Sequence, residues 1–463
     1  MGTIGAILPI LALIIMLTLL KAPAYLSAFT ALGISAVEAL FVFGLPLGEI
    51  GKCTLRGVAS GLFPIGLVII SALFTYALTV ESKAMDEIKK MLGSLSSDYR
   101  YLALIVIWGF GNFMEGMAGF GTAVAIPCAI LVGIGFDPVK AVLCALVANT
   151  TPTAFGSVGV PTMALADETA LGLGTLSSKI VLLQIAATSL SPFLILFITD
   201  GFRGLKEKFH LALIADIAFI LPWVATALTL GCELPDVIGG ISVMIVLGAM
   251  GNFRSINAKR ALWAWMPFAF VVIILGVAAF LPHDKKISPG ILILIAGILG
   301  ALAQRIRPLR IIALFFITLK KYALAITTIC FVLALAKIMG ASGMTAILAK
   351  CLMKISGSMY PLLASVVGSL GGFITGSGTS SNVLFGALQA SAGATEFEKL
   401  LFASANVMGA GIGKMICPQS IVLGCAATGL AGKESEIMKK VVVFFLIVLA
   451  VASIATFIFF RAQ

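Results

Sequence analysis

Charged residues are scarce in this chain, and their scarcity decides its class. Asp, Glu, Lys and Arg make up 11% of the 463 residues, against about 25% in soluble globular proteins. Hydrophobic residues make up 60%, and the mean hydropathy is +1.14. A soluble fold cannot bury so much apolar surface, so the lipid bilayer is the expected solvent. Helices are the expected element, because lipid leaves exposed backbone groups unpaired and the alternating pattern of a membrane barrel is absent.

Enzyme and metal-site motifs are also missing. The eight Cys form no CxxC pair, the two His have no metal-ligand neighbours, and no P-loop, HExxH or Ser-His-Asp pattern occurs. We therefore expect no enzyme, no cofactor and no metal. The net charge of +11 does not indicate nucleic-acid binding, because the basic residues lie in short loops between apolar runs.

The apolar runs are of two kinds. Those that read as ordinary spans, near the roughly 20 residues that a bilayer requires, are 4–20, 24–44, 57–80, 176–199, 209–230, 234–251, 262–281, 287–303, 318–340 and 439–460. Residues 101–166 and 359–428 are apolar too, but Gly, Pro, Asn, Ser and Thr interrupt them. Each indicates a re-entrant hairpin followed by a broken span. The prediction is an all-α integral membrane protein with about twelve transmembrane helices and two re-entrant hairpins.

The two interrupted regions resemble each other. "FMEG" (113–116) marks the first hairpin turn and "FITG" (373–376) the second. An asparagine, a glycine and a proline then recur at equal offsets: Asn149, Gly156 and Pro161 in the first region, Asn406, Gly413 and Pro418 in the second. An odd number of spans between the repeats makes the second inverted. Inverted repeats with broken helices predict a secondary transporter whose site lies near the bilayer midplane.

This symmetry predicts how the chain is divided. The segments are 1–100 (scaffold helices of the first repeat with an amphipathic connector), 101–175 (first hairpin and broken helix), 176–261 (connecting helices), 262–358 (scaffold helices of the second repeat with connector), 359–432 (second hairpin and broken helix) and 433–463 (terminal helix). The hairpins and broken helices would form the mobile unit of an elevator-type transporter. Lys and Arg favour alternate loops, beginning at Lys21. This bias predicts a multi-pass protein of the inner (plasma) membrane with both termini outside.

Lys414 is the sharpest functional signal. A lysine at the centre of a span costs about 2.5–3.5 kcal/mol even on a lenient scale, so it should face a polar cavity or a partner. Gly413 lets the backbone unwind, and Pro418 suits the first turn of a second half-helix. A lysine beside the positive end of a half-helix predicts an anion site. The alternative is that Lys414 snorkels to the outer surface, as is expected of Lys337 near a span end.

Polar clusters complete the predicted substrate site. Their hydroxyls and amides can bind carboxylate or hydroxyl oxygens, although they can also simply cap helix ends. They are Ser377, Thr379, Ser380 and Asn382 at the second hairpin, Asn149, Thr150 and Thr153 at the first break, and Asn406 in the second broken span. The residues expected to break helices are Gly116, Gly156, Pro161, Gly376, Gly413 and Pro418.

Glu115, at the tip of the first hairpin, is the predicted proton carrier. A carboxyl at membrane depth is rare and usually functional. Its alternative role is a structural ion pair or a contact to free helix N–H groups.

Four stretches carry a resemblance to a known family. "FMEGMAGFGTAVAI", "ANTTPTAFGSVG", "GFITGSGTSSNVLFGALQ" and "GIGKMICPQSI" occur in this order through both repeats. Together they resemble the L-lactate permease family. The resemblance implies inward transport of lactate and related short 2-hydroxy monocarboxylates such as glycolate, together with protons. It also implies a relationship to the ion transporter superfamily, whose elevator-type carriers often dimerise, so a homodimer is one expectation.

The sequence thus predicts a proton-coupled symporter for L-lactate, D-lactate and glycolate. Its partners would be this small carboxylate, protons and the lipid bilayer. One alternative is a sodium-coupled carboxylate symporter of the same fold. Another is a passive anion channel or a membrane subunit of a complex.

Overall fold

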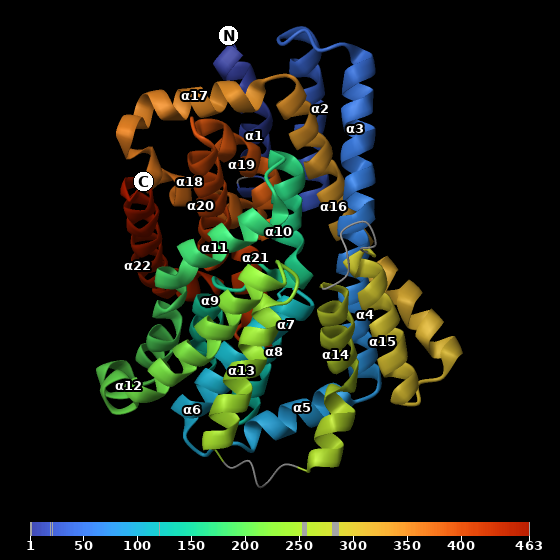
Figure 1. The fold of residues 1–463 in the computed structure, drawn as a ribbon, viewed down its shortest axis with the longest axis vertical. Coiled ribbons are helices and arrows are strands. Elements are labelled where there is room, and N and C mark those ends of the chain that lie inside the picture. Colours follow the sequence, from blue (N-terminus) through green and yellow to red (C-terminus); the bar gives the residue numbers. More distant parts are fainter. Residues whose placement is uncertain are drawn as a thin grey trace.

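The computed structural model describes residues 2–18, 20, 22–119, 121–251, 257–279 and 287–462. All secondary-structure elements in these ranges are helices (Figure 1). Seven segments are long and apolar enough to cross a membrane, or up to eight if a bent helix pair counts as one span. The chain is therefore an all-α integral membrane protein, as its composition predicts. The count of twelve spans stays a prediction, and Lys21 lies outside the described residues.

The first part of the chain forms an extended helical scaffold. Its elements are α1 (Gly2–Thr18), α2 (Ala24–Phe41), α3 (Leu47–Ser60), the π-helix η1 (Gly61–Gly66), α4 (Leu67–Glu81) and α5 (Ala84–Gly93). The span expected at 57–80 is longer than predicted, because α3, η1 and α4 follow one another as one run (Figure 1). The run is irregular around Pro64, which has no backbone N–H to donate.

The first hairpin and broken helix come next. They consist of α6 (Tyr99–Ala103), the π-helix η2 (Leu104–Gly111), α7 (Asn112–Met117), α8 (Thr122–Gly133), α9 (Pro138–Ala148) and α10 (Gly156–Thr169). The expectation that Gly116 breaks a helix is wrong, because it lies inside α7. The turn follows it, where Gly119 and Gly121 adopt positive φ angles of 63° and 83° that other residues rarely adopt. Ring contact between Tyr99 and Phe136, at a centroid distance of 6.2 Å, joins the open ends of this hairpin.

Connecting helices separate the two repeats. They are α11 (Leu173–Thr188), α12 (Leu190–Thr229) and α13 (Pro235–Met250). Helices α14 (Ala258–Ala279) and α15 (Pro289–Ala303) follow them and lie almost wholly in the predicted scaffold segment 262–358. Helix α12 is not one straight rod, because Asp200, Gly201 and Lys208 leave helical geometry. The predicted boundary between spans 176–199 and 209–230 falls at this interruption.

The second repeat and the terminal helix complete the chain. They comprise α16 (Pro308–Ala341), α17 (Met344–Ser356), η5 (Gly357–Met359), α18 (Tyr360–Thr375), α19 (Gly378–Ala392), α20 (Glu396–Lys414), α21 (Pro418–Thr428) and α22 (Glu434–Arg461). At the open end of the second hairpin, the Tyr360 hydroxyl donates to Gln389 Oε1 at 2.5 Å. The amphipathic helices α5 and α17 lie at opposite ends of the molecule (Figure 1). This placement agrees with an inverted second repeat.

Glycines bring α18 and α20 into close contact. A Cβ atom on Gly372 would lie 2.0 Å from the Ala410 carbonyl oxygen, and one on Gly413 would lie 2.0 Å from the Ser369 carbonyl oxygen. The sequence context predicts that Gly413 breaks a helix, and this prediction is wrong. Gly413 lies within α20, where its lack of a side chain permits the close contact with α18. The second hairpin is thereby fixed against the second broken helix.

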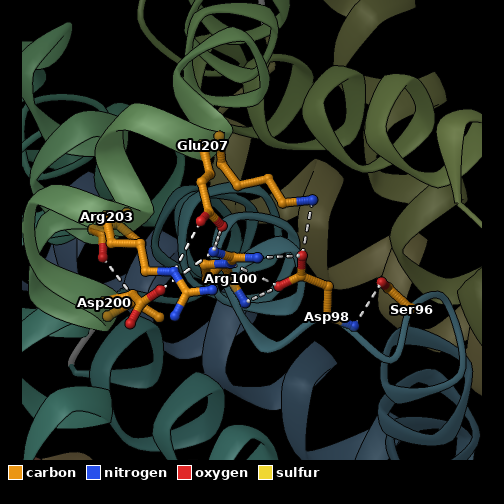
Figure 2. A network of polar contacts seen from close by, with 9 residues as sticks. Ser96, Asp98, Arg100, Asp200, Arg203 and Glu207 are labelled. Atoms are coloured by element: carbon orange, nitrogen blue, oxygen red, sulfur yellow. Dashed lines mark hydrogen bonds and ion pairs between the residues drawn. The ribbon is translucent and has the colours of Figure 1, made fainter.

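An ion-pair network fastens the base of the first hairpin to α12 (Figure 2). Arg100 Nη1 lies 2.7 Å from Glu207 Oε2 and 3.2 Å from Asp200 Oδ2. Asp98 accepts from Arg100 Nε at 3.1 Å and pairs with Lys208 Nζ at 2.9 Å. Burial alone would raise the pKa of Asp98, but the hydrogen bonds from Arg100 and Lys208 outweigh it and lower the pKa to about 2.

Replacing Asp98 should weaken the fold in a pH-dependent way. Because its pKa is lower in the folded chain, charged Asp98 contributes fully above about pH 4 and loses that contribution as the pH falls towards about 2. Asp98→Asn should reduce the free energy of unfolding by up to about 1 kcal/mol at pH 7, because the network is partly exposed. Thermal unfolding in detergent between pH 7 and 3 measures the difference, and Asp86→Asn, at an exposed pair of 3.9 Å, is the control. A gap between Asp98→Asn and the native chain that does not shrink with acid would contradict this assignment.

Candidate functional site

A buried ion pair joins the two halves of the chain. Lys414 Nζ lies 2.7 Å from Glu115 Oε1, and their side chains are 8% and 4% exposed. Lys414 therefore does not snorkel to the surface. Glu115 occupies the ion pair that was its alternative role, while its Oε2 has no hydrogen-bond partner among the residues that the structure describes. Removing one member of such a pair leaves an uncompensated buried charge, which costs about 3–5 kcal/mol.

The second broken helix places Lys414 at its break. Helix α20 ends at Lys414, α21 begins at Pro418, and the two are bent by 40°. The lysine thus lies in the last turn of α20, where the helix dipole favours a cation. Pro418 takes the first position of α21, where its missing N–H costs nothing. The first turn of α21 adds Gln419 and Ser420 to the cavity beside the lysine.

The first broken helix has a longer interruption. Non-helical chain follows α9 from Asn149 onward, and Ser157, Val158 and Gly159 then adopt φ angles of 47°, 58° and 81°. A β-branched residue such as Val158 rarely adopts a positive φ, so this turn is strained. Regular helix resumes only after it, with Pro161 in the first turn. The two breaks therefore end alike, each before a proline, but the first is longer than the equal sequence offsets predict.

Both hairpins and both breaks border one cavity of about 150 Å³. The predicted site residues that line it are Glu115, Thr153, Gly156, Pro161, Gly376, Ser377, Thr379, Ser380 and Lys414. Sequence reasoning missed Ser157, Thr328, Thr375, Gln419 and Ser420, which also line it. Gly376 has a left-handed φ of 66° and ends α18, which turns the chain toward the serine and threonine cluster. The cavity is smaller than the roughly 300–1,000 Å³ of sites for drug-sized ligands and suits a small anion.

Four predicted substrate residues lie outside the cavity lining. Asn382 Nδ2 donates to the Pro161 carbonyl at 2.9 Å, and Asn406 Nδ2 donates to Asn382 Oδ1 at 3.0 Å. These bonds tie the second hairpin to both broken helices. Thr150 Oγ1 donates to the Val147 carbonyl within its own helix end. Asn149 is buried, and its Oδ1 has no hydrogen-bond partner.

A third buried ionisable group, Asp236, lies beside the pair, and its sequence context does not mark it as functional. Asp236, 1% exposed, accepts a hydrogen bond from Trp223 Nε1 at 2.8 Å, and its Oδ2 is unpartnered. It interacts electrostatically with Glu115 and Lys414. A Cβ atom on Gly116 would lie 2.9 Å from its Cβ, so α7 and α13 meet there. An acidic residue after a proline at the start of an apolar run resembles an ordinary helix start.

Lys337, which is expected to snorkel near a span end, has a side chain that is 27% exposed and forms an ion pair. Its Nζ lies 2.9 Å from Glu168 Oε1, and the Glu168 side chain is 4% exposed. This pair connects α16 to the end of α10, and so links the predicted scaffold to the first broken helix.

Comparison with known proteins identifies relatives over nearly the whole chain. A family model described as L-lactate permease matches residues 2–288 and 277–462. An L-lactate permease of Streptococcus iniae is 35% identical over 84% of this chain and 90% of its own length. In Escherichia coli K12, an L-lactate permease is 32% identical (98% and 95% covered) and a glycolate permease 30% identical (98% and 96%). A solved structure of a transporter from Alcanivorax borkumensis is 16% identical and covers 91% of this chain and 88% of its own chain. Its TM-score of 0.40 indicates only a weak structural likeness.

Asn382→Leu should loosen the site without changing its charge. Leucine has a similar size but cannot donate to the Pro161 carbonyl or accept from Asn406, so buried polar groups lose their partners at a cost of about 1–3 kcal/mol each. We expect a lower unfolding temperature in detergent. Gln389→Leu, at the open end of the same hairpin, is a matched control that should also destabilise but leave ligand affinity unchanged. Native ligand affinity in Asn382→Leu would show that this brace does not order the cavity.

Proposed function

The chain belongs to the L-lactate permease family, and we propose that it carries L-lactate and related short 2-hydroxy monocarboxylates, including D-lactate and glycolate, inward together with protons. The observation that carries this proposal is the buried Lys414–Glu115 pair at 2.7 Å in the wall of a small polar cavity. A carboxylate substrate needs one desolvated cation, and this pair supplies one. A proton needs one carboxyl that can become neutral, and the same pair supplies it.

The pair couples anion binding to proton binding by charge balance. While Glu115 is ionised, Lys414 is already neutralised, and a second carboxylate would leave an uncompensated buried negative charge. Once Glu115 takes up a proton, Lys414 loses its partner and a substrate carboxylate can replace it. The loaded and empty sites then carry the same net charge. Uptake of one anion with one proton moves no net charge and follows the pH gradient.

Hydroxyl groups would orient the rest of the substrate. Ser377, Thr379 and Ser380 reach the cavity from the second hairpin, and Thr153 reaches it from the first break. Ser377 also accepts from the Ser380 backbone N–H at 3.2 Å, so capping and substrate binding coexist. A 2-hydroxy acid offers a hydroxyl beside its carboxylate, which these groups can bind as donors or acceptors.

The position of the cavity supports alternating access by an elevator motion. Its wall includes Ala24 from the start of α2, and Ala325 and Thr328 from α16, opposite the hairpin residues. The site thus lies between the hairpin segments (101–175 and 359–432) and the scaffold segments (1–100 and 262–358). In this proposal, the Lys337–Glu168 pair between α16 and α10 breaks when the hairpin unit moves.

Sodium coupling is a second candidate, favoured by one observation. At the first break, Asn149 Oδ1 and Thr151 Oγ1 are buried without hydrogen-bond partners. Oxygens at broken helices can hold Na⁺ in transporters of related design.

Uptake into proteoliposomes containing the purified full chain tests the function. Labelled L-lactate, D-lactate and glycolate are offered under a proton gradient alone, a sodium gradient alone and no gradient. Saturable accumulation driven by protons supports the proposal, and accumulation driven only by sodium replaces it with the second candidate. Flux that neither saturates nor exchanges substrate would indicate a channel. A requirement for a second protein would indicate a subunit of a complex.

Lys414→Ala should abolish uptake, because Lys414 is the one basic side chain among the described residues that line the cavity. Lys414→Arg should retain weakened uptake, since the charge remains but its geometry changes. Initial rates of lactate uptake measure both variants, and Lys399→Ala, at an exposed pair on the same helix, serves as control. Native rate and affinity in Lys414→Ala would overturn the anion-site assignment.

Glu115→Gln should separate exchange from accumulation. Glutamine keeps the size of the protonated acid but cannot release a proton, so Lys414 stays available to the substrate. We expect lactate exchange across the membrane to continue while accumulation driven by a proton gradient falls to background. Glu207→Gln in the peripheral Arg100 network is the control. Proton-driven accumulation by Glu115→Gln at the native level would assign the proton to another group.

A further inference from the structure

A second cavity, of about 640 Å³, lies between α5, α13 and α14. All residues that line it are apolar, among them Met91, Leu95, Phe113, Met244, Trp265 and Phe268. Water gains no hydrogen bonds from such walls, and apolar cavities favour apolar ligands. Apart from the indole N–H of Trp265, its lining side chains offer a carboxylate substrate no donor, and none of them is charged. The apolar cavity therefore suits an apolar ligand rather than the carboxylate proposed for the cavity at Lys414.

The cavity opens toward the part of the surface that faces lipid tails. Ile245, Leu262 and Ile273 contribute to its wall and are 59%, 69% and 58% exposed. In a membrane protein, exposed apolar side chains on spanning helices contact acyl chains. An acyl chain can therefore enter sideways from the bilayer, without crossing a polar barrier.

The groove is long enough for one leaflet. Its α14 wall runs from Ala258 to Ile273, about 22 Å along the helix axis at 1.5 Å per residue. Half of the hydrocarbon core of a bilayer is about 15 Å thick. Helix α5 runs across one end of the molecule between α13 and α14 (Figure 1), and its Met91, Leu92 and Leu95 form part of the wall. The amphipathic α5 thus marks the membrane surface at this end of the groove.

Two basic side chains lie at the same end. Lys259 and Arg260 occupy the first turn of α14, between the lining residues Ala258 and Ala261, and both are exposed. In the part of the chain that the structure describes, neither has an ion-pair partner within 4.0 Å. Basic residues beside a groove between spanning helices are the arrangement that recognises anionic headgroups.

We propose that this groove binds one anionic phospholipid, with an acyl chain along α14 and the headgroup at Lys259 and Arg260. The apolar walls and the side opening account for the chain, and the basic pair at the α5 end accounts for the negative headgroup. A zwitterionic lipid also presents a cation, which the two basic side chains repel, and a free fatty acid lacks the phosphate headgroup. The site is independent of what the polar cavity transports.

Native mass spectrometry and thermal unfolding of the purified full chain test the proposal, with phosphatidylglycerol and phosphatidylcholine of identical acyl chains as probes. The native chain should retain phosphatidylglycerol and unfold at a higher temperature in its presence than with phosphatidylcholine. Lys259→Gln with Arg260→Gln should weaken phosphatidylglycerol binding about thirtyfold. Lys433→Gln with Lys439→Gln, which removes the same charge from the exposed start of α22, should leave it unchanged.

A groove-filling variant separates the acyl-chain site from general attraction to charge. Ala269→Phe should reduce binding of phosphatidylglycerol while all basic residues remain. Equal retention of the two lipids by the native chain, or equal loss in both double variants, would overturn the headgroup assignment. Native binding by a folded Ala269→Phe would overturn the groove. The proteoliposome assay of lactate uptake can fail or succeed without changing any of these results.

Discussion

The fold is organised around one buried ion pair between residues 299 positions apart. Lys414 ends α20 and Glu115 lies in α7, so neither charge is tolerable at depth until these distant segments have assembled. Apolar surroundings make this pair costly to break. In the proposed mechanism the same cost couples the two ligands, because an anion that binds Lys414 is matched by a proton on Glu115.

Close backbone packing around the breaks makes the pair geometrically feasible. Glycines let α18 and α20 approach until their backbones touch. Asn382 bridges the second hairpin to the carbonyl of Pro161 in the first repeat. Because polar atoms freed by the helix breaks find partners across the repeats, the two interrupted segments support each other. The small cavity is what remains between them.

Asp236 adds a second buried carboxyl to the region of the Lys414–Glu115 pair. Two buried carboxyls interact with one lysine, and one oxygen of each lacks a hydrogen-bond partner. Asp236 is therefore a third ionisable group close enough to Lys414 and Glu115 to interact with both electrostatically. The strained left-handed turn at Ser157–Gly159 lies in the same region, since Gly159 packs against the Cys232 carbonyl just before α13. Strain concentrated in this way is typical of sites that change conformation.

The sequence alone determined the membrane class, the all-α fold and the two interrupted regions, and it singled out Lys414 and Glu115 as charges at membrane depth. These follow from composition and from the energetic penalty of charge in lipid, which act on each segment locally. Only the tertiary structure decided that Lys414 and Glu115 are partners, that Asn382 and Asn406 form a brace outside the cavity lining, and that Asp236 lies near the pair. The structure also shows that the first hairpin turns at Gly119 and Gly121 rather than at Gly116, and that Gly413 packs α20 against α18. These contacts join segments that are far apart in the chain. They depend on how whole helices pack together, which residue spacing and composition do not specify.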